Sequence, residues 1–146
     1  MSNNQCNRRV ILIFGDPNHG KSHLATQLHN NHGYHTVSLD EVYVEFIQNH
    51  YPNFFLPVLR GVILQHYNSM FAQDSSRVAA WCQHVVAITR NASNQNNLVA
   101  VEGYLLTPAL KLVEENLAGL ATVTIVEARH RNYFVARSVE EIAKAP

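Results

Sequence analysis

One eight-residue stretch near the N-terminus constrains this chain more than any other feature. Residues 15–22 read Gly-Asp-Pro-Asn-His-Gly-Lys-Ser, and they follow the apolar run at residues 10–14. The predicted order is a buried strand, a loop bounded by two glycines, and a helix that begins near the lysine. This is the pattern G-x-x-x-x-G-K-[ST], in which backbone amides and a helix N-terminus surround a phosphate group. The strand before and the helix after give the pattern the context that predicts nucleotide phosphate binding.

Each residue type in this loop has a physical role. Glycine allows the backbone to bend and to approach the phosphate closely. Lys21 reaches the outer phosphates as a point charge, and the Ser22 hydroxyl can ligate magnesium. We therefore expect the whole loop to hold the nucleotide, namely Gly15, Asp16, Pro17, Asn18, His19, Gly20, Lys21 and Ser22.

Length and charge limit the remaining possibilities. A chain of 146 residues predicts one domain with a single core. Lys plus Arg equal Asp plus Glu at 11 each, so no overall field draws the chain to nucleic acid. No apolar stretch approaches the roughly 20 residues that cross a bilayer, and residues 1–7 lack the apolar centre of a signal peptide. We expect a cytoplasmic protein without membrane contact.

Cysteine and histidine give weaker signals. Cys6 and Cys82 do not form a metal-binding pair, and two free thiols fit a reducing compartment. The chain has nine histidines, but no cysteine or carboxylate completes a tetrahedral zinc set at a familiar spacing. Zinc is therefore not expected.

Apolar patterning predicts alternating strands and helices. The expected strands are residues 10–14, 34–39, 98–101 and 121–126, and residues 22–31 form a helix that stops at Gly33. Residues 42–89 have a helical pattern that Pro52 and Pro57 interrupt, and residues 91–97 are expected to be a polar loop. Pro108 is expected to start another helix, with Thr107 as its cap.

The end of the chain carries one further expected helix, marked by Val135, Val139 and Ile142. Strands that alternate with helices form a parallel sheet through right-handed crossovers. The expected fold class is therefore α/β, with a parallel sheet of four to five strands covered by helices. Residues of about 42–97 would be a helical insertion between strands 2 and 3, within a single domain of residues 1–146.

Two carboxylates are expected beside the phosphate loop, because ligands bind beyond the carboxyl ends of parallel strands. Asp40 follows the second strand and could accept a proton from an attacking hydroxyl, while its structural alternative is a helix N-cap. Glu102 ends the third strand, where a buried charge needs a partner. That partner is magnesium or its water shell, or alternatively an arginine.

Arginines follow the fourth strand. A guanidinium can stabilise the negative charge that spreads over a transferring phosphate. Arg129 and Arg131 are the candidates for this role, with Arg137 further along. The alternative is that these arginines are ordinary surface residues.

Three segments together resemble the P-loop nucleoside and metabolite kinases. They are the phosphate loop, Ser-Leu-Asp-Glu-Val-Tyr at 38–43 and Val-Ala-Val-Glu-Gly at 99–103. The group that this chain resembles most contains the uridine kinases, phosphoribulokinases and pantothenate kinases. In that group a strand-end Asp is followed by a Phe-Tyr pair; here Val42 replaces the Phe and Tyr43 matches. The resemblance implies a P-loop NTPase fold.

The same resemblance implies roles for individual residues. Asp40 would be the general base, Glu102 a magnesium-associated carboxylate, and Lys21 with Ser22 the contacts to ATP and magnesium. Relatives usually carry a lid and a fifth strand. Residues 132–136 are a candidate last strand, but too few residues precede them for a parallel crossover.

The resemblance predicts a kinase that uses ATP and Mg²⁺ and transfers the γ-phosphate to a small-molecule hydroxyl, on a nucleoside, sugar or vitamin-like alcohol. Its acceptor pocket would be lined by Tyr43, Phe46, Tyr51 and Tyr67. ATP is favoured over GTP because no Asn-Lys-x-Asp element is present.

Three alternatives remain open. The chain could be a regulator or degenerate kinase that binds nucleotide without transfer, or a switch-type ATPase. It could also be a polynucleotide 5′-hydroxyl kinase, which the neutral net charge disfavours.

Overall fold

The computed structural model describes residues 7–15, 20–51 and 63–128. Among these residues no helix has both the length and the apolar character that a membrane crossing requires.

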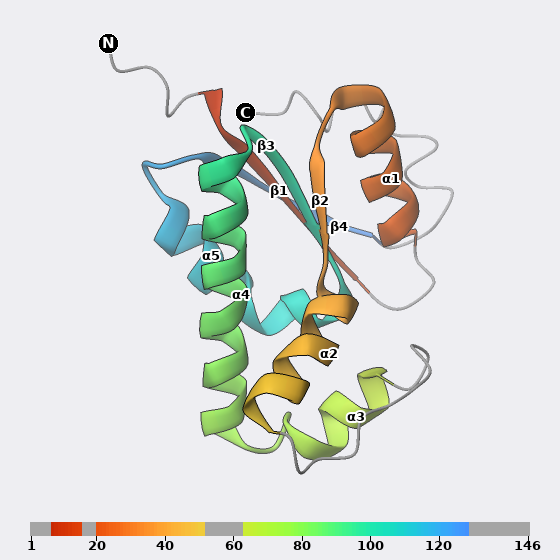
Figure 1. Ribbon diagram of the computed structural model, residues 1–146, viewed down its shortest axis with the longest axis vertical. Helices are drawn as coiled ribbons and strands as arrows, with labels where there is room; N and C mark the ends of the chain where they lie inside the picture. The colour runs from red at the N-terminus through yellow and green to blue at the C-terminus, as the bar shows by residue number, and fades with distance from the viewer. Residues whose placement is uncertain (1–6, 16–19, 52–62, 129–146) are drawn as a thin grey trace.

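A parallel sheet of four strands forms the centre of the described structure (Figure 1). The strands are β1 (Arg9–Phe14), β2 (His35–Ser38), β3 (Leu98–Glu102) and β4 (Thr122–Glu127). Their spatial order is β2-β3-β1-β4, and all three pairings are parallel. The apolar residues of β1 and β3 are buried because both strands are central, as their unbroken apolar runs predict. The predicted α/β class with a parallel sheet is confirmed.

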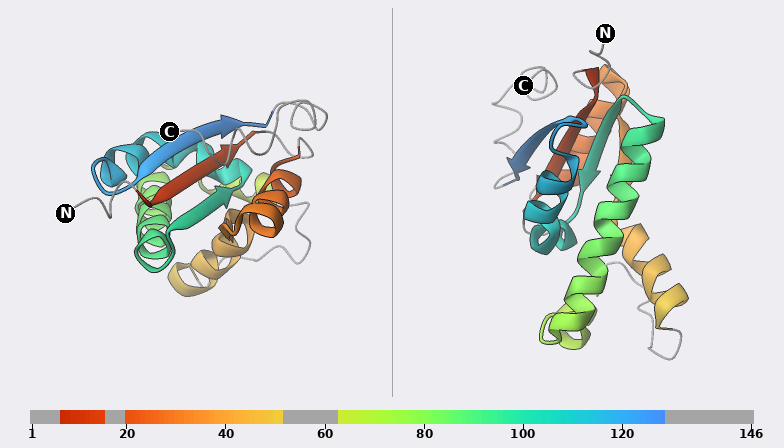
Figure 2. Two further views of the ribbon diagram at one scale, coloured as in Figure 1. Left: turned by 90° about the horizontal axis from the view of Figure 1, so that it is seen from above. Right: turned by 90° about the vertical axis from the view of Figure 1, so that its left-hand side faces the viewer.

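Helices cover both faces of this sheet. The elements between the strands are α1 (Lys21–His32), α2 (Leu39–His50), α3 (Ile63–Met70), α4 (Ser75–Gln95), the 3₁₀ helix η3 (Tyr104–Ala109) and α5 (Leu110–Leu117). Helix α1 lies on one face, whereas α4 and α5 lie on the other (Figure 2). Helices α2 and α3 lie beyond the ends of β2 and β3 (Figure 1).

Alternation along β1 divides the core into two clusters. Ile11 and Ile13 pack with Leu24 and Leu28 of α1. Val10 and Leu12, which alternate with these two residues, belong to the larger cluster formed with α2, α4 and α5. Successive side chains of a strand point to opposite faces, so one six-residue strand supports both layers.

The helix α1 ends where the sequence predicts. Gly33 has a φ of +74° and its amide donates to the His29 carbonyl oxygen at 3.2 Å. A left-handed glycine after the last turn is the common way to satisfy the final carbonyls of a helix. The amide of Tyr34 then donates to Leu28 at 3.2 Å, which leads the chain directly into β2.

The expected polar loop at residues 91–97 is wrong, because α4 continues to Gln95. Ala92 and Ser93 are buried on the same helix face as the preceding apolar stripe. The helix then ends at Asn96, whose side-chain amide donates to the Ala92 carbonyl oxygen at 3.1 Å. Tertiary packing overrides the low helix propensity of the asparagines in this segment.

The helix expected to start at Pro108 is also displaced. The chain turns directly from Gly103 into η3, which contains Pro108, and the α-helix begins only at Leu110. Two side chains of α4 satisfy carbonyls of η3. Trp81 Nε1 donates to the Leu105 oxygen at 3.0 Å, and Cys82 Sγ donates to the Pro108 oxygen at 3.3 Å.

Several expectations lie outside the described residues. They are the interruptions at Pro52 and Pro57, the candidate strand at 132–136, and the last helix with Val135, Val139 and Ile142.

Gly15 provides a test of this packing, because a methyl group there has no room. Its φ is +140°, and an added Cβ would lie 2.3 Å from the Ala128 carbonyl oxygen. We expect Gly15→Ala to lower the free energy of unfolding by about 2–4 kcal/mol, from overpacking together with backbone strain. Chemical denaturation measures the change.

Gly119→Ala is the matched control. Gly119 has a φ of +81° but no atom within 4 Å of an added Cβ, so only backbone strain of about 1 kcal/mol is expected. Equal losses in the two variants would contradict the contact between Gly15 and Ala128.

Candidate functional site

The carboxyl end of β1 is held between its two neighbours. On one side the Gly103 amide donates to the Ile13 carbonyl oxygen at 3.1 Å, and on the other the Ala128 amide donates to Phe14 at 2.7 Å. Gly15 follows at once, and its close contact with Ala128 allows no side chain. The chain therefore leaves β1 at a fixed position, and the predicted phosphate loop starts there.

The first turn of α1 begins beside this end of the sheet. Gly20 precedes it with φ 90° and ψ 13°, a left-handed conformation that glycine adopts at no steric cost. The first amides of a helix have no intrahelical partner and point toward its positive end. The turn contains no acidic residue. An anion is thus favoured at this position.

Lys21 and Ser22 open this helix and reach the same carboxylate. Lys21 is only 8% exposed, and its charge acts on Glu102. The Ser22 hydroxyl donates a hydrogen bond to the Glu102 carboxyl. A lysine is rarely so buried without an acidic partner, and Glu102 is a carboxylate within its electrostatic reach.

Glu102 is the centre of the group. It is the last residue of β3, and it is 8% exposed. The strand register pairs it with Ile13 of β1 and with Ser38 of β2. Since paired residues of parallel strands share a face, its side chain lies on the side of α1. Ser38 donates a second hydroxyl hydrogen bond to it.

The electrostatic environment of Glu102 opposes its ionisation. Burial raises the pKa of its carboxyl above the ordinary value, and the nearby carboxylate of Asp40 raises it further. The hydrogen bonds from Ser38 and Ser22 and the charge of Lys21 lower that pKa, but they do not compensate fully. These surroundings favour the neutral form of the Glu102 carboxyl, and a cation beside it would favour the ionised form instead.

Asp40 lies in the first turn of α2, as the second residue of that helix. The structure assigns the N-cap position to Ser38, so the alternative interpretation of Asp40 as the N-cap is wrong. A carboxylate in this position benefits from the positive end of the helix. Because Asp40 acts on the charge of Glu102, the two predicted carboxylates lie at one site.

The donor set fits magnesium. Magnesium prefers hard oxygen ligands, and it usually binds through one or two carboxylates together with waters and substrate phosphates. Ser22 and Glu102 offer a hydroxyl and a carboxylate beside the positive end of α1. In a site of this kind, waters and substrate phosphates would complete the coordination of the ion.

The remaining predicted residues cannot be compared with this group. Six of them lie outside the described residues, namely Asp16, Pro17, Asn18, His19, Arg129 and Arg131. Arg137 lies outside them as well. Within residues 7–15, 20–51 and 63–128, no cluster of three or more His, Cys, Asp or Glu side chains could hold a metal ion.

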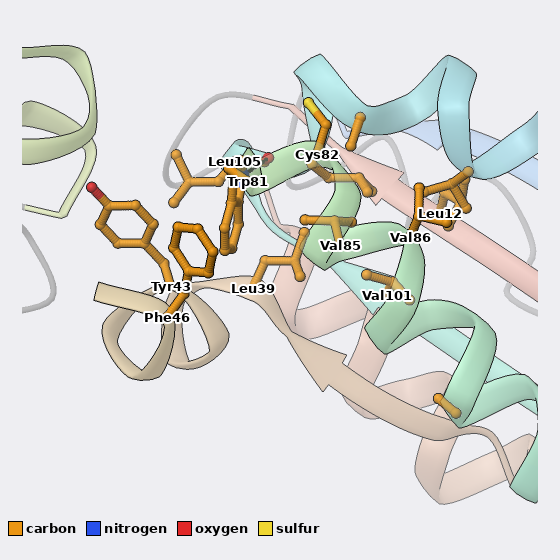
Figure 3. Packing of buried hydrophobic residues seen from close by; sticks show 14 of the residues in the cluster. Leu12, Leu39, Tyr43, Phe46, Trp81, Cys82, Val85, Val86, Val101 and Leu105 are labelled. Atoms are coloured by element: carbon orange, nitrogen blue, oxygen red, sulfur yellow. Dashed lines mark hydrogen bonds between the residues drawn. The ribbon is translucent and has the colours of Figure 1, made fainter. Parts of the chain in front are cut away.

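The predicted acceptor pocket is wrong for three of its four residues. Tyr43, Phe46 and Tyr67 are 0%, 2% and 5% exposed, and they pack against one another and against Trp81 as core. The rings of Tyr43 and Phe46 lie edge-on to Trp81, at centroid distances of 5.4 Å and 5.3 Å (Figure 3). Only Tyr51 is half-buried. Helical spacing alone cannot distinguish a pocket wall from a packed interior.

Two site features could not be read from the sequence. The bond from Ser38 to Glu102 depends on the register between β2 and β3, which pairs residues that are 64 positions apart. The Tyr43 hydroxyl bonds to Nδ1 of His66 at 2.8 Å, which joins α2 to α3. The strand-end position of Ser38, two residues before Asp40, was the one available signal.

No protein-family model matches the chain, and no curated protein matches it either.

The raised pKa of Glu102 predicts a pH dependence of stability. Between the pKa of the unfolded chain and the higher pKa of the folded chain, the folded protein binds more protons. The free energy of unfolding therefore falls as pH rises through this window, and this contribution is constant above it. Glu102→Gln removes the titrating group, so we expect its free energy of unfolding to fall less than that of the wild type as pH rises. Urea denaturation from about pH 4 upward measures both proteins.

Glu115→Gln, on the exposed side of α5, controls for the loss of a carboxylate. Identical pH dependence in wild type and Glu102→Gln would contradict the buried position of Glu102.

Tyr43 tests whether the aromatic cluster is core. Tyr43→Phe keeps the ring but removes the bond to His66, so we expect a loss of about 1 kcal/mol in unfolding free energy. Tyr43→Ala leaves a cavity and should cost about 3–5 kcal/mol. Thermal and chemical denaturation measure both variants. A loss below about 1 kcal/mol in Tyr43→Ala would contradict burial at this position.

Proposed function

We propose that this chain is an ATP- and magnesium-dependent kinase that transfers a phosphoryl group to a hydroxyl of a small molecule. One observation carries the proposal. The buried Glu102 receives a hydrogen bond from Ser22 and lies within electrostatic reach of Lys21 and Asp40. Two further features support the proposal. They are the sequence pattern of residues 15–22 and the sheet order β2-β3-β1-β4, which is compatible with a P-loop fold.

In this proposal the start of α1 binds the phosphates. The first amides of the helix and the ammonium group of Lys21 neutralise charge on the outer phosphates. Ser22 and Glu102 would hold magnesium, Glu102 directly or through water. When bound, magnesium stabilises the charge that develops on the phosphate oxygens.

Asp40 is the proposed general base. Its carboxylate accepts the proton of the acceptor hydroxyl while the acceptor oxygen forms a bond to the γ-phosphorus. The bond from that phosphorus to the bridging oxygen breaks, and ADP leaves with the electron pair. Arg129 and Arg131 remain the proposed groups that stabilise the transferring phosphate.

A second function is favoured by the aromatic cluster. Three of the four predicted acceptor-lining residues are core, so the described α2, α3 and α4 show no pocket made by them. A regulator that binds ATP and magnesium without transfer needs no acceptor site. The proposed nucleotide contacts are the same in both functions, and only Asp40 would lose its catalytic role.

Asp40→Asn separates the two functions. For a kinase we expect transfer to a stimulating alcohol to fall about 100- to 10,000-fold, the usual contribution of a general base. ATP affinity should change little. A screen of nucleosides, sugars and vitamin-like alcohols for stimulated ADP release identifies the acceptor, and equilibrium titration with a fluorescent ATP analogue measures affinity.

Glu41→Gln is the matched control, since this exposed neighbour on α2 also loses a carboxylate. If no alcohol stimulates ADP release while ATP still binds, the regulator is the better function. Hydrolysis that no alcohol changes indicates a switch-type ATPase instead.

Lys21→Ala tests nucleotide binding itself. Removal of a charged hydrogen-bond donor should weaken ATP binding about 10- to 100-fold. Lys111→Ala, on the exposed side of α5, is the control and should bind as the wild type does. ATP affinity that survives in Lys21→Ala would overturn the proposed site.

A further inference from the structure

Ser38 occupies the N-cap position of α2 but does not cap the helix. Its φ of −97° and ψ of 117° are those of an N-cap residue, yet its side chain makes no cap hydrogen bond. The N-cap of α4 behaves differently, because the Asp74 side chain accepts hydrogen bonds from the Ser76 and Arg77 amides. A serine in this position ordinarily accepts from the second or third amide of its helix. Ser38 therefore uses its hydroxyl elsewhere.

The hydroxyl of Ser38 donates to Glu102 instead. Register places the two residues opposite each other at the carboxyl ends of β2 and β3, with their side chains on the face of α1. Ser38 is half-buried, and Glu102 is 8% exposed. The bond thus links two neighbouring strands at the edge where the proposed nucleotide site lies.

Glu102 has two hydroxyl donors with different fates. Ser22 is at the start of α1 and is itself a proposed magnesium contact, so its hydroxyl would change partner on nucleotide binding. Ser38 belongs to β2, outside the proposed contacts, and would keep its bond. Asp40, which lies in α2, repels the carboxylate of Glu102. Ser38 would then oppose rotation of this carboxylate away from the cation through a directional hydrogen bond, which the charge of Lys21 does not supply.

We propose that Ser38 is a positioning residue, which orients the Glu102 carboxylate toward nucleotide-bound magnesium. This inference rests on the proposed function. The inference also explains why Ser38 makes no cap hydrogen bond in α2, because its hydroxyl already donates to the Glu102 carboxylate. Loss of a hydrogen-bond partner of a metal-binding side chain typically lowers metal affinity about 10- to 100-fold.

The test is the magnesium dependence of nucleotide binding by the full chain. A fluorescent ATP analogue is titrated into each protein at fixed magnesium concentrations, with an EDTA sample as the metal-free reference. For Ser38→Ala we expect the magnesium concentration at half-maximal effect to rise about 10- to 100-fold. Affinity in EDTA should equal that of the wild type.

Two further variants control this comparison. Ser38→Thr keeps a hydroxyl and should restore the wild-type magnesium midpoint. Ser76→Ala removes a serine hydroxyl at the start of α4, where it bonds to Asp74 at 2.8 Å, and should leave the midpoint unchanged.

If Ser38→Ala does not fold, Ser38→Cys keeps the inference testable, since a thiol has a similar shape but is a weak donor. Its magnesium midpoint should lie above that of the wild type.

Two results overturn the inference while the proposed function stands. One is an unchanged magnesium midpoint in Ser38→Ala and Ser38→Cys. The other is an equal loss of affinity with and without magnesium, which is the signature of a structural role. A wild-type protein that binds no ATP analogue at any magnesium concentration overturns the proposed function and this inference together.

Discussion

Strand β1 is paired in parallel with β3 on one side and with β4 on the other, and this double pairing determines where the candidate site lies. It fixes the position at which the chain leaves the sheet at Gly15 and returns in α1. It also aligns Glu102 with Ile13, so that a carboxylate lies directly beside the start of that helix. Without this register, Lys21 and Ser22 would begin a helix that faces no carboxylate.

Burial of Glu102 has an energetic consequence for the whole site. A carboxylate at the end of a central strand loses solvation, and Asp40 adds repulsion from a second carboxylate. Two hydroxyls and one ammonium group compensate in part. A fold under selection for stability alone would gain from an apolar residue at this position. The arrangement is understandable if a bound cation, as in the proposed function, completes the compensation.

Much of the fold could be predicted from sequence because its strongest signals are local. The apolar run before Gly15 and the glycine after α1 determine a strand, a loop and a helix within 25 residues. The C-terminal end of α4 and the start of α5 could not be predicted. Trp81 and Cys82 satisfy the carbonyls of η3 from another part of the chain, so local propensity does not decide that turn.

For the site, sequence reasoning identified Lys21, Ser22, Asp40 and Glu102, and the structure brings these four residues together. It missed Ser38, which lies inside the expected strand 34–39 and whose side-chain partner depends on the register between β2 and β3. It also misassigned Tyr43, Phe46 and Tyr67, because aromatic residues at helical spacing fit a pocket and a core equally well. Burial depends on which helix packs opposite, and α4 is distant from α2 in sequence.

The most direct test of the central claim is a crystal structure of the full chain with Mn²⁺ and a non-hydrolysable ATP analogue, in which the anomalous signal of manganese locates the cation. We predict that the phosphates lie at the first turn of α1 and contact Lys21. The cation should lie between Ser22 and Glu102, with Ser38 still bonded to the carboxylate. Phosphates and cation at another surface, with α1 and Glu102 unaltered, would contradict the account.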